Sequence, residues 1–193
     1  MMEMKPFIKI DRQLCLYLAR PELAEPVFAV VDAQRSYLRQ WLPWVDATVS
    51  VEDTKAFILE SIEHNSNGAR LTTFLALDEE LIGSLGVVQF NRDHKKCEVG
   101  YWLREEYQGK GLMTKACAFL IDYLFNTKDL NRIEILVARE NEKSAAIPTR
   151  LGFKREGTLR QGLYMYRAFH DLDLFSLLRQ EWNVDGKRTS PIF

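Results

Sequence analysis

The segment at residues 105–114, EEYQGKGLMT, has one glycine on each side of a lysine, immediately before an apolar run. Gly109 and Gly111 give the backbone conformational freedom, and their lack of Cβ atoms lets a ligand approach the main chain closely. The apolar run is typical of a helix, whose first N–H groups and positive dipole end favour an anion. The spacing therefore allows either a phosphate-binding loop or an ordinary turn between a strand and a helix.

Neither of the two common nucleotide-binding loops matches this spacing. A P-loop has the pattern G-x-x-x-x-G-K-[ST], and the dinucleotide fingerprint has G-x-G-x-x-G near the start of its strand–helix–strand unit. In this chain Gly111 is followed by Leu112, Met113 and Thr114. Because glycine makes up about 7% of residues in general, a lone G-x-G arises about once by chance in a chain of this length. The spacing by itself leaves both interpretations open.

Composition limits the classes to which the chain can belong. Its 193 residues suit one domain, and a hydrophobic content of 47% is enough for a sizeable core. With 26 basic and 27 acidic residues the formal net charge is −1, which gives no electrostatic surface for nucleic acid. We expect residues 1–180 to form a single domain and residues 181–193 to form a poorly ordered tail.

The cysteines and the hydrophobic runs indicate a cytoplasmic protein. Cys15, Cys97 and Cys117 are odd in number and lack CxxC spacing, so neither a disulfide framework nor a zinc site is expected. The first eleven residues carry charges and a proline where a secretory signal would be apolar. No apolar run approaches the ~20 residues that are needed to span a bilayer.

Hydrophobic periodicity predicts a mixed α/β domain around the glycine loop. Short apolar or alternating runs predict seven strands, at residues 13–19, 71–78, 81–90, 96–103, 132–138, 152–160 and 170–178. Apolar positions at helical spacing predict helices at residues 22–34, 35–41, 51–65, 112–125 and 141–151. The three runs between residues 71 and 103 are joined by short polar turns, which is typical of an antiparallel meander.

Local signals mark the course of several predicted helices. Pro26 suggests a kink or break in the first helix. Ser50 and Asp53 form a pair that resembles a capping box ahead of the third helix, and Gly68 suits its end.

The chain resembles the GCN5-related N-acetyltransferase (GNAT) family. QGKGLM at residues 108–113 resembles the pyrophosphate loop of that family, and CEVGYWL at residues 97–103 resembles its fourth strand. RIEILVARENEKSAAIPTRLGFKREGTLR resembles its fifth strand, the following helix and the "GF" turn. With YLRQWLPW upstream, the chain looks like the RimJ/RimL-like branch, which acetylates the N-termini of ribosomal proteins. Each motif is loose, but their joint order is specific over residues 14–178.

The resemblance implies a GNAT fold with a central, mostly antiparallel sheet of seven strands, flanked by four or five helices. The fourth and fifth strands would splay apart, and acetyl-CoA would bind in the gap between them. The main chain of Leu103, Arg104 and Glu105 would hold the pantetheine arm and the thioester. A backbone N–H near Leu103 would polarise the carbonyl as an oxyanion-hole donor.

The same resemblance places the pyrophosphate on the backbone N–H groups of the glycine loop. The residues so assigned are Gln108, Gly109, Lys110, Gly111, Leu112, Met113 and Thr114. Lys110 could add positive charge or could be an ordinary solvated lysine. Met113 replaces the small residue of the family pattern, so the backbone there is expected to approach the phosphates less closely.

Two polar residues of the predicted helix at 141–151 also match the family. Asn141 matches the asparagine that hydrogen-bonds the pantetheine, and it equally suits a helix N-cap. Ser144 matches a serine that can protonate the departing CoA thiolate, although a solvent-facing serine of the first turn is the alternative. Pro148 is a departure, because proline removes a backbone hydrogen bond inside a helix.

Acyl transfer to an amine needs a base that removes a proton at neutral pH. Glu98, on the implied fourth strand and facing the cleft, is one candidate and would act through water. Glu156 matches a proposed base glutamate of the ribosomal branch. Either could instead form a structural salt bridge, and the sequence ranks the two equally.

Other reactive side chains receive structural roles. The three histidines lie in polar or loop-like settings and are expected to be exposed rather than catalytic: His64, His94 and His170. Cys117 is expected to be a core residue. Trp41 and Trp44 could line the acceptor groove or could pack in the core or a lid.

The function implied by the resemblance is direct transfer of acetyl from acetyl-CoA to a primary amine, most simply the N-terminal amine of a ribosomal protein. A polyamine, amino acid or antibiotic is an alternative acceptor, and a non-catalytic acyl-CoA-binding module is an alternative function. No metal is expected. We expect a monomer or homodimer that binds neither nucleic acid nor membrane.

Overall fold

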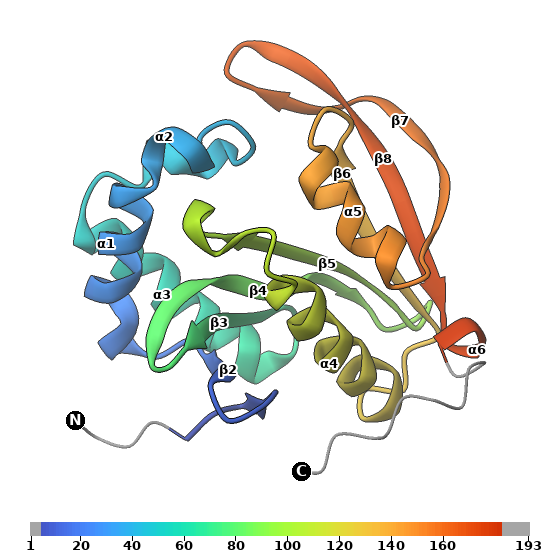
Figure 1. The fold of residues 1–193 in the computed structure, drawn as a ribbon, viewed down its shortest axis with the longest axis horizontal. Helices are drawn as coiled ribbons and strands as arrows, with labels where there is room; N and C mark the ends of the chain where they lie inside the picture. The colour runs from blue at the N-terminus through green and yellow to red at the C-terminus, as the bar shows by residue number, and fades with distance from the viewer. Residues whose placement is uncertain (1–4, 183–193) are drawn as a thin grey trace.

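The computed structural model describes residues 5–182, which form one mixed sheet with helices on both faces (Figure 1). The spatial order of the strands is β1-β2-β3-β4-β5-β6-β8-β7. Their bounds are β1 Ile8–Lys9, β2 Leu14–Leu18, β3 Leu71–Leu77, β4 Glu80–Asn91, β5 Lys96–Leu103, β6 Arg132–Ala138, β7 Lys154–Met165 and β8 Ala168–Leu178. The mixed α/β class predicted from the sequence is confirmed.

The described residues contain six α-helices and three short 3-10 helices. The α-helices are α1 Ala24–Ala33, α2 Arg35–Leu38, α3 Val51–Asn67, α4 Leu112–Asn126, α5 Glu142–Arg150 and α6 Arg179–Trp182. The 3-10 helices are η1 Pro21–Leu23, η2 Pro43–Ala47 and η3 Glu105–Tyr107. None of the helices in this part of the chain is both long and apolar enough to cross a membrane.

The sheet is antiparallel except where β5 meets β6. These two strands run parallel because the connection between them contains α4, which crosses over one face of the sheet. Their pairing covers three positions, Lys96–Glu98 against Arg132–Glu134. Beyond these positions the described parts of β5 and β6 are no longer paired, so a gap opens between them. The predicted splay of the fourth and fifth long strands is present.

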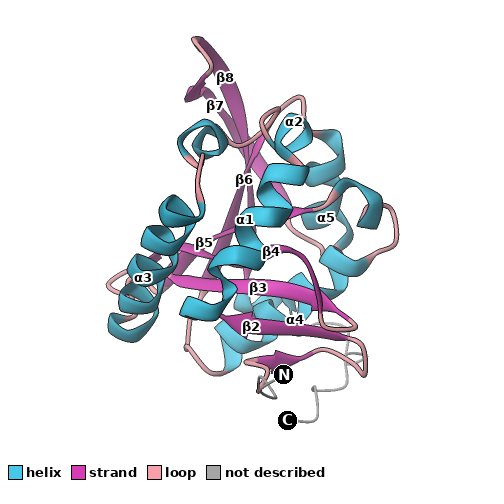
Figure 2. Ribbon diagram, turned by 90° about the vertical axis from the view of Figure 1, so that its left-hand side faces the viewer, coloured by secondary structure: helices cyan, strands magenta, loops and turns pink. Residues whose placement is uncertain are grey.

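Two hydrophobic clusters lie on opposite faces of the sheet. The side chains of Cys97 and Val99 pack with α4 and α5 in the larger cluster. Trp102 packs with α1, α2 and α3 in the smaller one. Because side chains alternate between the faces of a strand, Glu98 points to the face that α1 and α2 cover. Figures 1 and 2 show the two helical layers.

Within residues 5–182 the sheet has eight strands rather than the expected seven. The additional strand, β1, has two residues, and Ile8 and Lys9 pair with Leu16 and Cys15 of β2. Such a short strand has too few residues to show a pattern of its own. It depends on its partner, and the sequence interpretation therefore missed it.

The helix signals were partly correct. Ser50 and Asp53 form a reciprocal capping box, and Gly68 ends α3 in the left-handed conformation. The break expected at Pro26 was wrong, because Pro26 is the third residue of α1 and lies in its first turn. The N–H groups of a first turn have no intrahelical partner, so a proline there removes no helix hydrogen bond.

The last two strands, predicted at residues 152–160 and 170–178, extend toward each other to form a long hairpin, and Figure 2 shows it reaching beyond the rest of the sheet. A register shift between Leu159 and Leu163 lets pairing resume after an irregular stretch. The turn at Tyr166 and Arg167 has positive φ angles of 50° and 65°.

The tip of this hairpin is fastened to the segment that follows α2. The Tyr166 hydroxyl donates to the Leu42 carbonyl at 2.9 Å. The Arg39 guanidinium lies 3.9 Å from the centre of the Tyr166 ring and binds Asp46. These contacts connect the β7–β8 hairpin, at the top of Figure 1, to the segment that follows α2.

The proposed domain boundary at residue 180 stays a prediction. Of the expected tail, Glu181 and Trp182 belong to α6. The remainder of the tail, residues 183–193, lies outside the described residues.

Candidate active site

A cavity of about 1150 Å³ occupies the gap between β5 and β6. Its walls come from the C-terminal halves of these strands, the glycine loop, the start of α4, and α5. The segment at residues 37–43 and the β7–β8 hairpin complete the lining. Because these walls belong to elements on both sides of the sheet, the cavity passes through the sheet rather than lying on one face.

The glycine loop has the conformation that its two glycines make possible. Gly109 and Gly111 have φ angles of +71° and +75°, a region that residues with a Cβ rarely adopt. A Cβ built at either position would meet nothing within 4 Å. The glycines are therefore required for backbone conformation and not for packing against the protein, and their cavity side is open to a ligand.

The start of α4 offers unpaired backbone donors to the same space. Gly111 is the N-cap and no side chain caps the helix, so its first N–H groups have no partner within the helix. Leu112, Met113 and Thr114 line the cavity. The Met113 side chain packs into the core and is 3% exposed. This arrangement fits a phosphate group, which helix N-termini bind through their N–H groups and dipole.

Two residues assigned to the cofactor from the sequence make other contacts. The Arg104 side chain binds Glu80 and Glu106. The Lys110 ammonium lies 5.1 Å from the centre of the Tyr107 ring and is exposed. Neither contributes to the cavity wall, whereas the other predicted cofactor residues do: Leu103, Glu105, Gln108, Gly109, Gly111, Leu112, Met113, Thr114 and Asn141.

The Leu103 N–H points into the gap. The next residue, Arg104, donates its N–H to the Ile82 carbonyl of β4 at 2.8 Å. In an antiparallel pair successive residues alternate between facing the partner strand and facing away from it. Leu103 therefore faces away from β4, toward the cavity, as an oxyanion donor must.

Gln108 connects both sides of the cavity mouth. Its amide nitrogen donates to the Tyr37 hydroxyl, and its amide oxygen accepts from the Lys143 ammonium at 3.2 Å. Tyr37 belongs to α2 and Lys143 to α5, so three separate elements meet at one side chain. Neither Tyr37 nor Lys143 was singled out from the sequence, because the partners lie 71 and 35 residues from Gln108 along the chain.

The first turn of α5 carries both polar residues that the family resemblance assigned to it. The Asn141 side chain accepts from the Ser144 N–H at 3.1 Å, so Asn141 is the N-cap. Its amide nitrogen remains a donor for a ligand, and Asn141 and Ser144 both line the cavity. Ser144 is half-buried, which argues against the alternative of a solvated surface serine.

The two candidate bases have different surroundings. Glu98 lines the cavity at the last paired position of β5, directly beside Glu134 of β6. Burial, with a smaller contribution from the negative charge of Glu134, raises the pKa of Glu98 above its ordinary value. A carboxylate with a raised pKa is a better proton acceptor, and this one faces the space where a reaction would occur.

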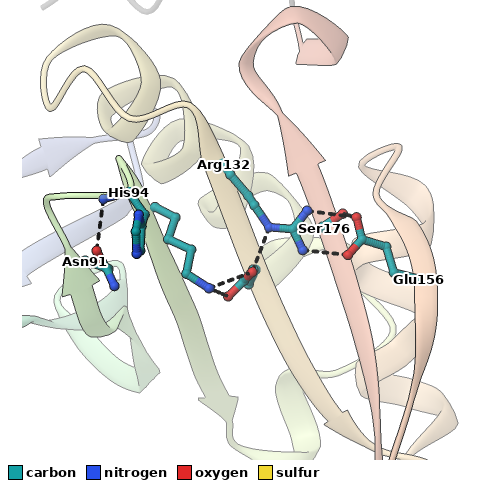
Figure 3. Close-up of polar contacts among 7 residues, drawn as sticks. Asn91, His94, Arg132, Glu156 and Ser176 are labelled. Atoms are coloured by element: carbon teal, nitrogen blue, oxygen red, sulfur yellow. Dashed lines mark hydrogen bonds and ion pairs between the residues drawn. The ribbon is translucent and has the colours of Figure 1, made fainter.

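Glu156 lies outside the cavity wall. Arg132 donates two hydrogen bonds to its carboxylate, at 2.8 and 2.6 Å, and Ser176 donates a third at 2.6 Å (Figure 3). These bonds, the Arg132 pair first, lower the pKa of Glu156 to about 2. The carboxylate is fully engaged in a structural contact between β6, β7 and β8.

A Glu156→Gln variant is expected to keep the wild-type turnover and to lose a little stability. We expect about 0.2–1 kcal/mol at pH 7, because the pair is substantially exposed. The pKa of Glu156 is lower in the folded state than its unfolded value of 4.5. Its carboxylate therefore stabilises the protein at pH values above 4.5, and this stabilisation is lost as the pH falls toward about 2. Denaturant unfolding of both proteins across that pH range measures the difference. A large loss of turnover in folded Glu156→Gln would contradict the structural role.

The tryptophans, Cys117 and the histidines have different surroundings. Trp41 lines the cavity, whereas the Trp44 ring packs 6.4 Å from that of Trp102. Cys117 is fully buried in the core, as expected. His94 is exposed, as predicted, but His64 and His170 are half-buried and take part in contacts with Glu60 and Glu140. Among residues 5–182, no group of three or more His, Cys, Asp or Glu side chains could hold a metal ion.

Comparison with known proteins decides the family. The family described as "Acetyltransferase (GNAT) domain" matches residues 13–154 of this chain. The chain belongs to the GNAT acetyltransferase family. It is accordingly an N-acetyltransferase, whose acetyl donor in this family is acetyl-CoA, and the resemblance seen in the sequence is confirmed.

Individual GNAT relatives cover almost the whole chain. The putative ribosomal N-acetyltransferase YdaF of Bacillus subtilis (strain 168) is 34% identical, over 90% of this chain and 96% of its own length. The ribosomal-protein-serine acetyltransferase of Escherichia coli (strain K12) is 29% identical, over 88% and 94%. A crystal structure of a probable acetyltransferase superposes with a TM-score of 0.87 at 33% identity, over 91% of this chain and 98% of the other.

Proposed function

We propose that this enzyme transfers acetyl directly from acetyl-CoA to the N-terminal amine of a protein, and that its acceptors are ribosomal proteins. The observation that carries the proposal is the cavity through the sheet, which brings Glu98 on one face and Ser144 on the other into one space. The acceptor class is supported by the two relatives whose names refer to ribosomal acetylation.

The shape of the acceptor side supports a chain end as substrate. Leu42 and Pro43 form one wall, and Leu163 and Leu172 of the hairpin form the other. The bond from Tyr166 to Leu42 joins these two walls. A chain end can enter beneath such a bridge, whereas an internal segment of a folded protein would have to pass across it.

On the donor side the chain's own backbone would do most of the binding. The N–H groups at the start of α4 would receive the pyrophosphate, and the amide nitrogen of Asn141 would donate to the pantetheine arm. The Leu103 N–H would stabilise negative charge on the thioester oxygen as it develops. Acetyl-CoA, when bound, supplies the acetyl group and the thiolate leaving group.

The two side chains would move protons at opposite ends of the transfer. Glu98 would accept the proton of the attacking amine, through a water molecule, and its raised pKa suits this role. Ser144 would donate to the departing sulfur. Glu156 is not proposed as the base, because its carboxylate is held by Arg132 and Ser176.

The proposed acceptor also bears on where the enzyme acts in the cell and on its oligomeric state. A ribosomal acceptor places the enzyme in the cytoplasm, where free thiols such as those of Cys15, Cys97 and Cys117 stay reduced. We propose that the protein has a single catalytic domain, acts as a monomer or homodimer, and binds neither nucleic acid nor membrane.

Thiol release from acetyl-CoA tests the acceptor. The panel contains peptides with ribosomal-protein N-termini, the same peptides with a blocked N-terminus and a free internal lysine, and small amines such as spermidine. We expect release with free N-termini and at least tenfold less with the blocked peptides. Faster release with spermidine would identify a small-amine acetyltransferase. If acetyl-CoA raises the melting temperature but no acceptor gives release, the protein is an acyl-CoA-binding module.

A further inference from the structure

Pro148 leaves one carbonyl of α5 without its usual partner. In an α-helix the N–H of residue i donates to the carbonyl of residue i−4, so position 148 would serve Ser144. Proline has no N–H, and its ring also crowds the i−4 carbonyl. Pro148 lies inside α5 and is buried. The residue that loses its helix hydrogen bond is therefore Ser144, one of the two residues to which we assign a proton transfer.

The Tyr101 hydroxyl takes the place of the missing donor. It donates to the Ser144 carbonyl at 3.0 Å, and its oxygen lies 3.4 Å from Ser144 Oγ, which donates to it. A phenol has one proton and free lone pairs, so it can make both contacts at once. Burial raises the pKa of Tyr101, which keeps the hydroxyl protonated and able to donate.

This contact spans the gap that forms the cavity. Tyr101 lies in the half of β5 that is paired with β4 but not with β6, and Ser144 lies in the helix that follows β6. The phenol thus holds the main chain and the side chain of Ser144 at a fixed place relative to β5, the strand that also carries Glu98 and Leu103. Positioning of this kind matters for rate, since a displacement of ~1 Å can cost about a hundredfold.

We propose that Tyr101 is the positioning residue for Ser144, and that Pro148 makes this possible by leaving the Ser144 carbonyl free for the phenol. The inference rests on the proposed function of Ser144 as the proton donor to the leaving sulfur. Tyr101 acts through Ser144 and is not itself the proton donor.

Three variants and their combinations test this proposal. Tyr101→Phe removes the hydroxyl and keeps the ring, and kcat is expected to fall about tenfold. Pro148→Ala restores an N–H at position 148 but no contact with β5, so Tyr101→Phe/Pro148→Ala is expected to regain stability without regaining kcat. In a Ser144→Ala background Tyr101→Phe is expected to cause no further decrease. Tyr17→Phe, in a strand away from the cavity, serves as the matched control and is expected to leave kcat unchanged.

Thermal unfolding of the protein without ligand supplies an independent readout. The destabilisation by Tyr101→Phe is expected to shrink when Pro148→Ala is also present, because the Ser144 carbonyl again has a donor. This non-additivity is expected whether or not the acceptor has been identified correctly.

The outcomes separate this inference from the proposed function. If Ser144→Ala lowers kcat but Tyr101→Phe does not, the positioning role is wrong and the role of Ser144 stands. An undiminished effect of Tyr101→Phe on kcat in the Ser144→Ala background would also overturn it, as would a destabilisation by Tyr101→Phe that Pro148→Ala does not reduce. If Ser144→Ala keeps the wild-type kcat, the proposed role of Ser144 fails and the inference fails with it.

Discussion

Replacing Glu98 by glutamine is expected to lower kcat by about 10²–10³-fold, with little change in the KM for acetyl-CoA. The substitution keeps the size of the side chain but removes its ability to accept a proton from the amine, and loss of a general base typically has this magnitude. Donor binding is assigned to the glycine loop and the start of α4, and Glu98 belongs to neither element. Steady-state rates at saturating acetyl-CoA, measured with Glu156→Gln as the carboxylate control, test the assignment.

The pH dependence gives a second signature of Glu98. Its pKa lies above the ordinary value of 4.5 because of burial and of Glu134, partly offset by Lys96, so the wild-type rate should rise with pH through that raised pKa. This limb should be absent from Glu98→Gln. Because the folded state binds this proton more tightly than the unfolded state, ionised Glu98 costs stability at neutral pH. The variant should therefore melt no lower than wild type. A residual rate that still rises with pH through the same limb would refute the assignment.

Gly111→Ala is expected to weaken acetyl-CoA binding tenfold or more. At φ +75° an added Cβ is strained, which costs about 1–2 kcal/mol, and the loop can relieve the strain only by turning its N–H groups. The added Cβ would also occupy open space at a residue that lines the cavity. Isothermal titration with CoA and the KM for acetyl-CoA measure the effect.

Gly152→Ala is the matched control for this substitution. Gly152 also has a left-handed conformation, at φ +85°, and an added Cβ there meets nothing within 4 Å. It follows α5 and lies outside the cavity wall, so its replacement should lower stability similarly without changing affinity for CoA. Equal losses of affinity in both variants would mean that general destabilisation, not the phosphate cradle, explains the result.

The sequence was most informative where local pattern and tertiary setting agree. The bounds of β5 and β6 were predicted without error, because each is an apolar run between polar turns. The glycine loop needed its neighbours to be interpreted, since two glycines before a helix are compatible with an ordinary turn. Their positive φ angles and the uncapped start of α4 supply what spacing could not.

The features that were missed depend on contacts between distant residues. Glu98 and Glu156 were equivalent candidates until Arg132, 24 residues before Glu156, was found to bind the latter. Tyr101 gave no signal as a functional residue, because its role arises from a helix 43 residues away. The last two strands were predicted without the residues that join them as a hairpin, because the irregular register and the polar turn interrupt the hydrophobic alternation.

The opening between β5 and β6 has a consequence for the order of chemical events. Because the cavity passes through the sheet and is open to both faces, donor and acceptor can be bound at the same time, each entering from its own side. Both reactants are then present at high effective concentration, and the entropy of bringing them together is lost on binding rather than in the transition state. The enzyme has no need to carry the acetyl group itself between two half-reactions. The short pairing of β5 with β6, three positions long, thus leaves a gap in which a ternary complex of enzyme, donor and acceptor can form.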